Sequence, residues 1–474
     1  MNARRLLGIA VAGVLLAAGS AQAIIKVDVR MSDLYAKASQ VLIGQVAAVK
    51  GTALTVKVTS SAKGSPPGPA IQVDLGSVAA ADVAPGQPAV VLVGRAKGAA
   101  VHLADRWFQA DAVSPTSFRL TREEGVTVSF PGRTATLARL MLDYQVGKAH
   151  FLQAVEHNVI GGGFKVLKVG PAPALLASAD VNGDGKDEVL IGYADRVQLA
   201  DVSGDAVVDL TAARGLAGAS GDGAVFGDAN GDGRPDLLLG SRWYENTGAA
   251  FAATGGPVAL PPVGERLATA LDDVTGDKKP DLLVLLASGD VQVYAGPAWQ
   301  KVSTKSLWQG GEPAIAAHFS RDWGADREMC VMVVTRRQAT RYALDGSEPP
   351  ATFERLAGRS ESYKPEADGL AAVFAMPIDI NGDGLLDYII LRENQGGPML
   401  VNRGYGMFMD NPDAAGHWQP SGRGRGPWPP YGRYTPTTKF VAADVYGDKF
   451  DDLVVATDKG DLVVKSNTPF PPHP

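Results

Sequence analysis

A nine-residue acidic motif recurs from residue 180 onward and constrains the fold more than any other feature of the chain. Its three complete copies begin at Asp180, Asp228 and Asp379. They follow the pattern Asp-x-Asn-Gly-Asp-Gly-x-x-Asp, with Glu at the last position of the first copy. Two weaker copies begin at Asp273 and Asp444, where Lys replaces the second glycine and Thr or Tyr replaces the asparagine. Such an internal repeat indicates one supersecondary unit used several times.

The spacing of the copies matches the size of a propeller blade. A degenerate sixth position, Ser320–Glu328, keeps only Asp322 and Glu328 of the acidic pattern. The first positions are then 180, 228, 273, 320, 379 and 444, which lie 48, 45, 47, 59 and 65 residues apart. Four short strands need about 45 residues, so we expect about six four-stranded blades with loop insertions in the two longer intervals.

Each copy lies between two short apolar segments. In the first copy, Leu175–Ala179 precedes the motif and Val189–Ile191 follows it, and the same arrangement holds at the other positions. Continuous apolar runs of this length are typical of strands buried on both faces. The expected fold class is therefore mainly β, a β-propeller in which strand, acidic loop and buried strand are repeated in every blade.

The last blade lacks an outermost strand of its own, because its pattern ends near Leu462–Lys465. Phe164–Val169 precedes the first motif much as Phe251 precedes the third. We therefore expect 164–169 to pair with the C-terminal blade, which closes the ring and removes an open sheet edge.

The side chains at motif positions 1, 3, 5 and 9 are candidate ligands for a hard cation. Calcium takes six to eight oxygen ligands, and carboxylates and amides at this spacing converge in a tight loop. In the complete copies the candidates are Asp180, Asn182, Asp184, Glu188, Asp228, Asn230, Asp232, Asp236, Asp379, Asn381, Asp383 and Asp387. In the weaker copies they are Asp273, Asp277, Asp281, Asp444, Asp448 and Asp452. The expected cofactor is Ca²⁺, about three to five ions.

Two alternatives apply to these loops. All of them could be Asp/Asn/Gly turns without metal, and in the weaker copies Lys278 and Lys449 could neutralise the acids instead of a cation. The Ser320–Glu328 position is expected to be a packed loop, with Cys330 a buried small hydrophobe.

The repeated Asp-x-Asn-Gly-Asp-Gly frame with its flanking strands resembles secreted bacterial proteins with FG-GAP/VCBS repeats, whose blades are similar to those of the integrin α-chain propeller. The resemblance covers about 300 of the 451 residues after residue 23. It implies calcium in the three complete loops. It is a weak guide to function, because one propeller scaffold hosts many functions.

Four segments are expected along the chain. Residues 1–23 have the arginines, the short apolar run and the small-residue cleavage site of a signal peptide. Residues 24–132 are expected to form a small β-barrel or sandwich, with an oligonucleotide/oligosaccharide-type barrel as one option. Residues 133–160 are expected to form a linking helix, and residues 161–474 the propeller. The expected strands of the small domain are Val41–Val46, Leu54–Val58, Ile71–Leu75, Val90–Val93 and Val126–Phe130. His150 and His157 lie two helical turns apart, but no third metal ligand is visible.

Charge and motif content narrow the functional classes. A net charge of −6 with only 45 basic residues argues against a nucleic-acid partner. No apolar run after the signal peptide is long enough to span a membrane. There is no zincin, nucleophile-elbow or phosphate-loop motif. We expect an exported, periplasmic or extracellular monomer that is not an enzyme and binds an extracellular protein, glycan or cell-surface component. The alternatives are a polysaccharide-acting enzyme and a structural envelope protein.

The insertion 417–434 is the candidate ligand-binding surface. Exposed aromatic and arginine side chains are the usual anchors of protein interfaces, and aromatic rings also stack on sugars. The candidates are Trp418, Arg423, Arg425, Trp428, Tyr431, Arg433 and Tyr434. The alternative is that the aromatic rings only pack the loop onto the blades. A second insertion, 346–368, is expected to be a polar surface loop.

Overall fold

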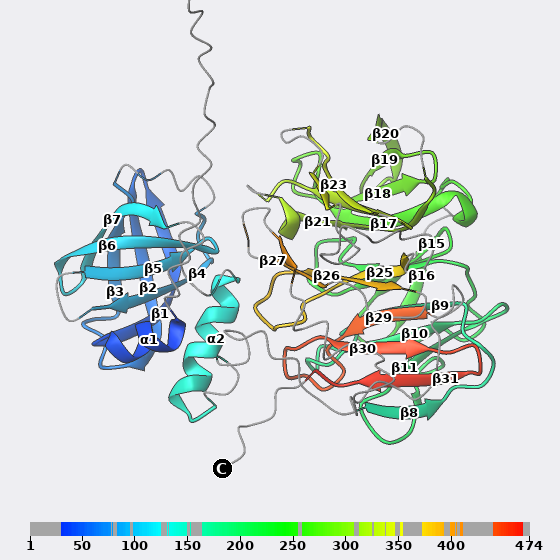
Figure 1. Cartoon of the computed structure of the whole chain (residues 1–474), viewed down its shortest axis with the longest axis horizontal. Coiled ribbons are helices and arrows are strands. Elements are labelled where there is room, and N and C mark those ends of the chain that lie inside the picture. The colour runs from blue at the N-terminus through cyan, green and yellow to red at the C-terminus, as the bar shows by residue number, and fades with distance from the viewer. Residues whose placement is uncertain are drawn as a thin grey trace, which may run out of the picture.

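The computed structural model consists of a small β-barrel, a helix and a six-bladed propeller (Figure 1). It describes residues 30–467 except 77, 79–82, 95–97, 125–129, 131, 149–151, 153–163, 255–257, 308–311, 325–326, 337, 347–350, 354–371, 393–398, 403, 405–407 and 411–438. The signal peptide predicted for 1–23, the insertion 417–434, His150 and His157 all lie outside the described residues.

The N-terminal domain is a closed seven-stranded barrel. Its strands are β1 (Gln40–Lys50), β2 (Ala53–Lys63), β3 (Ala70–Asp74), β4 (Pro88–Val93), β5 (Gly98–Leu103), β6 (Arg106–Ser114) and β7 (Ser117–Glu124). They close in the order β1-β2-β3-β7-β6-β5-β4, and only β3 and β7 run parallel. Apolar side chains alternate inward along the strands, and Leu54, Val101 and Phe118 lie in the barrel core. The domain is therefore a barrel rather than a sandwich.

The sequence located β1 to β4 but missed β5, β6 and β7. Strands β6 and β7 carry weak signals because they contain few large apolar side chains: Trp107 and Phe108 in β6, and Phe118 and Leu120 in β7, are the large buried ones. The fifth expected strand, Val126–Phe130, lies outside the described residues except for Phe130, which is fully buried.

Two helices accompany the barrel, α1 (Met31–Lys37) and α2 (Thr134–Gln145). Leu137, Leu140 and Met141 of α2 are buried against the barrel. Helix α2 ends at Gln145, and the chain turns at Gly147 with φ = 88°. Most of the remaining expected stretch to residue 160 lies outside the described residues, and Leu152 within it is helical and buried. No helix in the described ranges is long and apolar enough to cross a membrane.

The propeller has six four-stranded antiparallel sheets. From the axis outward, blades 1 to 3 are β9 (Leu175–Ala179) to β12 (Val208–Asp209), β13 (Ala224–Gly227) to β16 (Phe251–Thr254), and β17 (Arg266–Asp272) to β20 (Gln300–Ser306). Blades 4 and 5 are β21 (Ala314–Ser320) to β24 (Ala351–Phe353), and β25 (Ala372–Ile378) to β28 (Phe408–Asp410). Blade 6 is β29 (Lys439–Ala443), β30 (Asp452–Ala456), β31 (Asp461–Lys465) and β8 (Phe164–Lys168).

The second strand of each blade accounts for much of the core. These strands are β10 (Glu188–Gly192), β14 (Asp236–Leu239), β18 (Asp281–Leu286), β22 (Cys330–Thr335), β26 (Asp387–Arg392) and β30. Buried side chains occupy all of β10, β14, β22 and β30, because each strand is covered by the neighbouring blades on both faces. The insertion 346–368 was expected to be a polar surface loop. It also contains a strand, because Ala351–Phe353 is the outer strand of blade 4.

The ring closes as the sequence predicted. Strand β8 pairs antiparallel with β31, with Val166 opposite Val463 and Leu167 opposite Leu462. Blades 6 and 1 are also joined at the acidic loops, where the Asp444 N–H donates to the Asp187 carboxylate and the Asp187 N–H to the Asp444 carbonyl, at 3.0 and 2.9 Å. The first and last parts of the propeller sequence therefore share one sheet.

Removing β8 should leave β31 as an unpaired, aggregation-prone sheet edge. A chain that begins at residue 170 loses the partner of β31, and its unpaired N–H and C=O groups can recruit a second molecule. We expect it to aggregate in size-exclusion chromatography with light scattering, whereas a matched chain that begins at residue 161 stays monomeric. A monodisperse, well-folded 170–474 fragment would show that the closing strand is dispensable.

Candidate metal-binding loops

Every acidic motif occupies the same place in its blade, the loop from the innermost strand to the second strand. In blade 1, β9 ends at Ala179 and β10 begins at Glu188, so the loop contains motif positions 1 to 8. The sequence folds this way because aspartate and asparagine side chains bond to nearby backbone N–H groups in preference to extending the sheet.

The carboxylate at position 1 organises the turn. Asp180 Oδ1 accepts hydrogen bonds from the N–H groups of Gly183 and Asp184 at 2.7 and 3.1 Å, and Oδ2 accepts one from Gly185 at 2.9 Å. Asp228 and Asp379 accept the corresponding three bonds in their own loops. The first acid is therefore a structural centre of the loop whether or not metal is present.

Position 6 requires a left-handed backbone. Glycine fills it in the complete loops, with φ between 84° and 87° at Gly185, Gly233 and Gly384. In the weaker loops Lys278 and Lys449 adopt the same conformation, at φ = 65° and 69°. Their N–H groups still donate to the position-1 carboxylates. The loop geometry thus persists at the cost of strain on a residue with a Cβ atom.

The carboxylate at position 9 ties the end of the loop to its beginning. One oxygen accepts the N–H of position 2 at 3.0–3.1 Å in five blades. In blades 2, 5 and 6 the other oxygen accepts the backbone N–H of an asparagine at or just after the end of the third strand, at 2.7–2.8 Å: Asn246, Asn402 or Asn467. These asparagines are not among the site residues predicted from the sequence.

Each of these asparagines also reaches the preceding blade. The side-chain amides of Asn246, Asn402 and Asn467 donate to the carbonyl oxygens of Val181, Asp322 and Ile380, at 2.9, 2.7 and 2.5 Å. The signal that could have found two of them is an asparagine shortly before a glycine after the third strand, as in Glu-Asn-Thr-Gly and Val-Asn-Arg-Gly. In blade 3, Gly296 follows the third strand at this point, and Asp281 Oδ1 is buried without a hydrogen-bond partner.

The donor set fits a hard cation, because it consists of carboxylates and amides. Two buried oxygens with no hydrogen-bond partner, Asp281 Oδ1 and Asp448 Oδ2, also suit a cation. The side chains are nevertheless not gathered around one point. In the complete loops the asparagine amide N–H₂ group at position 3 donates to the position-5 carboxylate at 3.2 Å. Within the described ranges, no three Asp, Glu, His or Cys side chains form a group that could hold a metal.

Burial and mutual repulsion favour the protonated form of several acids. Burial raises the pKa of Glu188 to about 7, and Asp184 and Asp180 add to the shift. Burial likewise raises the pKa of Asp452 to about 8 and that of Asp451 to about 7. The pKa of Asp379 is raised well above its usual value by burial, with Asp383 and Asp451 as the nearest like charges. A bound cation would relieve this repulsion.

The loops fall into two groups by exposure. Asp184, Asp232 and Asp277 in blades 1 to 3 are exposed, whereas Asp383 in blade 5 is fully buried. The covering element is the N-terminal end of α2. The Arg133 N–H donates to the Asp383 carbonyl at 2.9 Å, and Arg139 Nη1 donates to the Asp448 carbonyl at 3.1 Å.

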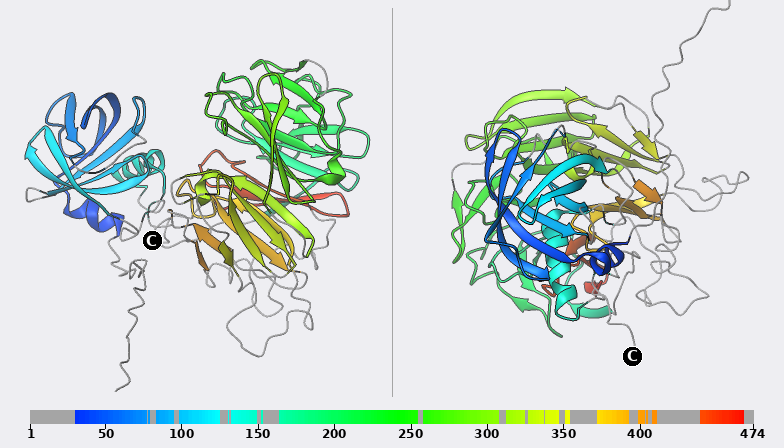
Figure 2. Two further views of the ribbon diagram at one scale, coloured as in Figure 1. Left: turned by 90° about the horizontal axis from the view of Figure 1, so that it is seen from above. Right: turned by 90° about the vertical axis from the view of Figure 1, so that its left-hand side faces the viewer.

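The barrel and α2 therefore dock on the acidic-loop face of blades 4 to 6 (Figure 2, right panel). Asp105, at the β5–β6 turn of the barrel, forms an ion pair with Arg327 of blade 4 and accepts the N–H of Thr134. Phe450 of the last loop packs into the cluster formed by α2 and the barrel.

The degenerate position in blade 4 is a packed loop, as expected. Asp322 accepts a hydrogen bond from Arg133 at 2.7 Å and another from the N–H of Leu386 at 3.2 Å. Trp323 and Cys330 are fully buried. The guanidinium of Arg133, from the N-terminal part of the chain, thus neutralises Asp322 in this loop.

Comparison with known proteins identifies the repeat. Residues 180–239, from the first motif to the end of β14, match the FG-GAP-like repeat family. No curated protein matches the chain.

Three solved structures match parts of the chain at low sequence identity. A chain of the Photorhabdus luminescens Tc holotoxin pore is 14% identical with a TM-score of 0.44, over 83% of this chain and 17% of that one. BBS1N in complex with ARL6DN is 13% identical with a TM-score of 0.37, over 65% and 97%. Chaetomium thermophilum Raptor is 12% identical with a TM-score of 0.36, over 67% and 30%. The chain thus spans less than a fifth of the Photorhabdus chain.

Strain at position 6 predicts a stabilising substitution. Lys278→Gly removes the Cβ atom from a residue with left-handed backbone. The steric strain that is relieved outweighs the conformational entropy that glycine adds to the unfolded chain. We expect about 0.5–1 kcal/mol of added stability in chemical denaturation. The matched control is Lys279→Gly, whose backbone is not left-handed, and which should destabilise by a similar amount. Equal effects of the two substitutions would contradict the strain argument.

The raised pKa values predict the pH dependence of the metal-free protein. Asp451 and Asp452, with pKa values of about 7 and 8 in the folded state, bind protons more tightly when folded than when unfolded. Their contribution to stability is fully present below the unfolded pKa near 4 and is lost as the pH rises through 7 to 8. Denaturation in a chelator should therefore give a free energy of unfolding that falls between pH 5 and 8. Asp451→Asn should flatten this slope, and an unchanged slope would assign it to other groups.

Proposed function

We propose that this FG-GAP repeat β-propeller is an exported, calcium-loaded binding protein without catalytic activity. Its ligand is an extracellular protein, a glycan or a cell-surface component. The observation that carries the proposal is the split of the acidic-loop face: helix α2 and the barrel cover the loops of blades 4 to 6, while those of blades 1 to 3 remain exposed.

The division of the loops supports two roles for bound calcium. In blades 5 and 6 a cation would neutralise acids beneath α2 and strengthen the docking of the barrel. In blades 1 to 3, calcium held by Asp180, Asp228 and the acids of their loops would leave the exposed loops rigid and less negative. That is a surface suited to a partner of moderate charge.

Binding rather than catalysis accounts for the polar groups near the core. The acids bond to the backbone of their own loops. Among the described histidines, His102 bonds to Thr134 Oγ1 and His318 to Tyr388, so neither pairs with a serine or cysteine nucleophile. Export by the predicted signal peptide would bring the chain to a compartment rich in calcium.

Calcium loading is tested by thermal unfolding of residues 24–474 in EGTA and in millimolar Ca²⁺. One site at hundredfold saturation adds about 2.7 kcal/mol, so three sites should raise the Tm by more than about 5 °C. The triple variant Asp184→Ala, Asp232→Ala, Asp383→Ala should lose the shift, and Asp195→Ala, an exposed acid outside the loops, should keep it. No shift in the unmodified protein would refute calcium loading.

The binding role is tested by titrating labelled protein onto isolated cell envelopes, with and without calcium. Saturable binding that is weakened by Trp428→Ala or Arg425→Ala would support it and assign the insertion 417–434 to the interface. Release of reducing ends from envelope polysaccharides would instead establish an enzyme.

A further inference from the structure

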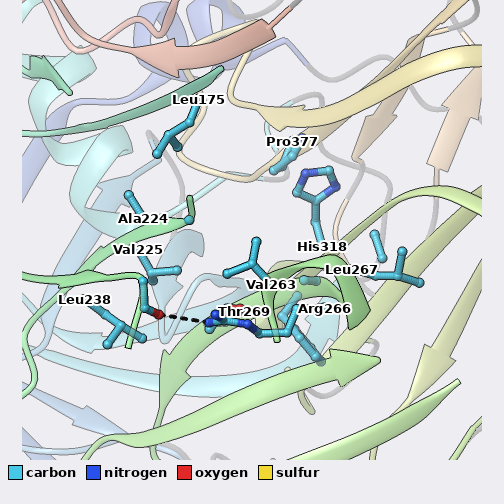
Figure 3. Close-up of a pocket in the computed structure, with 16 residues that line it drawn as sticks. Leu175, Ala224, Val225, Leu238, Val263, Arg266, Leu267, Thr269, His318 and Pro377 are labelled. Atoms are coloured by element: carbon cyan, nitrogen blue, oxygen red, sulfur yellow. Dashed lines mark hydrogen bonds between the residues drawn. The ribbon is translucent and has the colours of Figure 1, made fainter. Parts of the chain in front are cut away.

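A cavity of about 350 Å³ lies on the propeller axis and is separate from the acidic loops (Figure 3). Its walls are formed by the innermost strands of blades 1 to 5 and by the adjoining loops. Most of the lining residues are small or aliphatic, such as Leu175, Ala224, Val225 and Ala270. A cavity of this size and composition is suited to a small molecule with an apolar body.

The cavity extends to the end of the axis opposite the docked barrel. Gly223, Gly240 and Val263 line it and lie just before β13, just after β14 and just before β17. The acidic loops, and with them α2, are at the other ends of these strands. A ligand can therefore enter without displacing the barrel, and its binding does not depend on the function proposed above.

Three polar side chains face this cavity: Arg266 and Thr269 of β17 and His318 of β21. Figure 3 shows Arg266 along one side of the cavity and the His318 ring directed toward Pro377 on another. Arg266 is the only charged residue among the described residues that line the cavity.

The tautomer of His318 follows from its partner. Tyr388 is fully buried, and within the described ranges its hydroxyl has one hydrogen-bond partner, His318 Nδ1, at 2.8 Å. A buried hydroxyl proton without an acceptor is costly, so Tyr388 donates to Nδ1. The histidine is neutral at pH 7, because burial lowers its pKa to about 4. Its proton is therefore on Nε2, which is left as a second hydrogen-bond donor of the site.

Arg266 forms no ion pair within the described residues. Its Nη1 donates to the Gly240 carbonyl at 3.1 Å, and its Nε has no partner. Burial lowers the pKa of this guanidinium, against the opposing influence of Asp222 and Tyr294. No carboxylate within the described ranges lies at ion-pair distance from it. The cavity thus contains a half-buried positive charge and a neutral N–H donor, with the Thr269 hydroxyl between apolar walls.

We propose that the axial cavity is a binding site for a small organic carboxylate with an apolar body. The carboxylate would pair with Arg266 and accept hydrogen bonds from Thr269 or His318, while the aliphatic or aromatic body would contact the apolar side chains of the innermost strands. The polar side chains of the lining are a guanidinium, a neutral imidazole N–H and a hydroxyl, with no carboxylate among the described lining residues. This set favours an anion over a neutral polyol or a cation.

The test is isothermal titration of residues 24–474 with hexanoate, octanoate and benzoate, each against its neutral amide. At least one carboxylate should bind at millimolar concentration or below, and its amide should bind at least about tenfold more weakly, as expected for loss of a charge-assisted hydrogen bond. Arg266→Gln should weaken binding of the carboxylate by a similar factor and leave binding of the amide unchanged. The control Arg242→Gln, at an exposed arginine of blade 2, should bind normally.

A second variant keeps the proposal testable if Arg266→Gln fails to fold. Ala224→Leu places a larger apolar side chain in the cavity and should abolish binding while the Tm stays the same or rises. The proposal is overturned if no carboxylate of the series binds, if amides bind equally well, or if binding survives both Arg266→Gln and Ala224→Leu.

Discussion

The bond between the position-9 carboxylate and the N–H of position 2 is the interaction on which the propeller depends. It closes the acidic loop in five blades and fixes where the second strand begins. In three blades the same carboxylate orients an asparagine that bonds to the preceding blade. One acid thus links a local turn to the stacking of blades. Neighbouring blades in other junctions use different groups, such as Arg321 with Asp272 between blades 3 and 4.

Docking of the barrel breaks the symmetry of the ring. The six blades share one design, yet Asp383 under α2 is fully buried, whereas Asp184, Asp232 and Asp277 on the opposite side are exposed. The same Asp-x-Asn-Gly-Asp-Gly sequence therefore has different electrostatics in blade 2 and blade 5. The degenerate loop of blade 4 lies under Arg133, which forms an ion pair with Asp322 of the loop. Arg327 of the loop forms a second ion pair, with Asp105 of the barrel. The blade that has lost the acidic pattern is therefore the one whose loop forms ion pairs with the barrel and with the residue before α2.

Sequence reasoning succeeded where a physical signal was repeated and failed where it was single. The repeated loops and buried runs predicted the blades and their number, because the same signal recurs along the chain. The closing strand, expected at 164–169, followed from the incomplete last repeat. The strands β5 to β7 carry no such repetition and were missed. So were Asn246, Asn402 and Asn467, whose importance depends on a carbonyl in another blade. The cavity around Arg266 could not be found either, since its residues come from five blades.

The sequence by itself determined the local conformations. Asp and Asn side chains that bond to their own backbone, glycines that allow positive φ, and apolar runs that must be buried are all properties of a few adjacent residues. Only the tertiary structure decided which loops are covered, which carboxylates have raised pKa values and where an unpaired arginine faces a cavity. Those properties depend on burial and on charges that are far apart in the chain, and they arise only when the ring has closed and the barrel has docked.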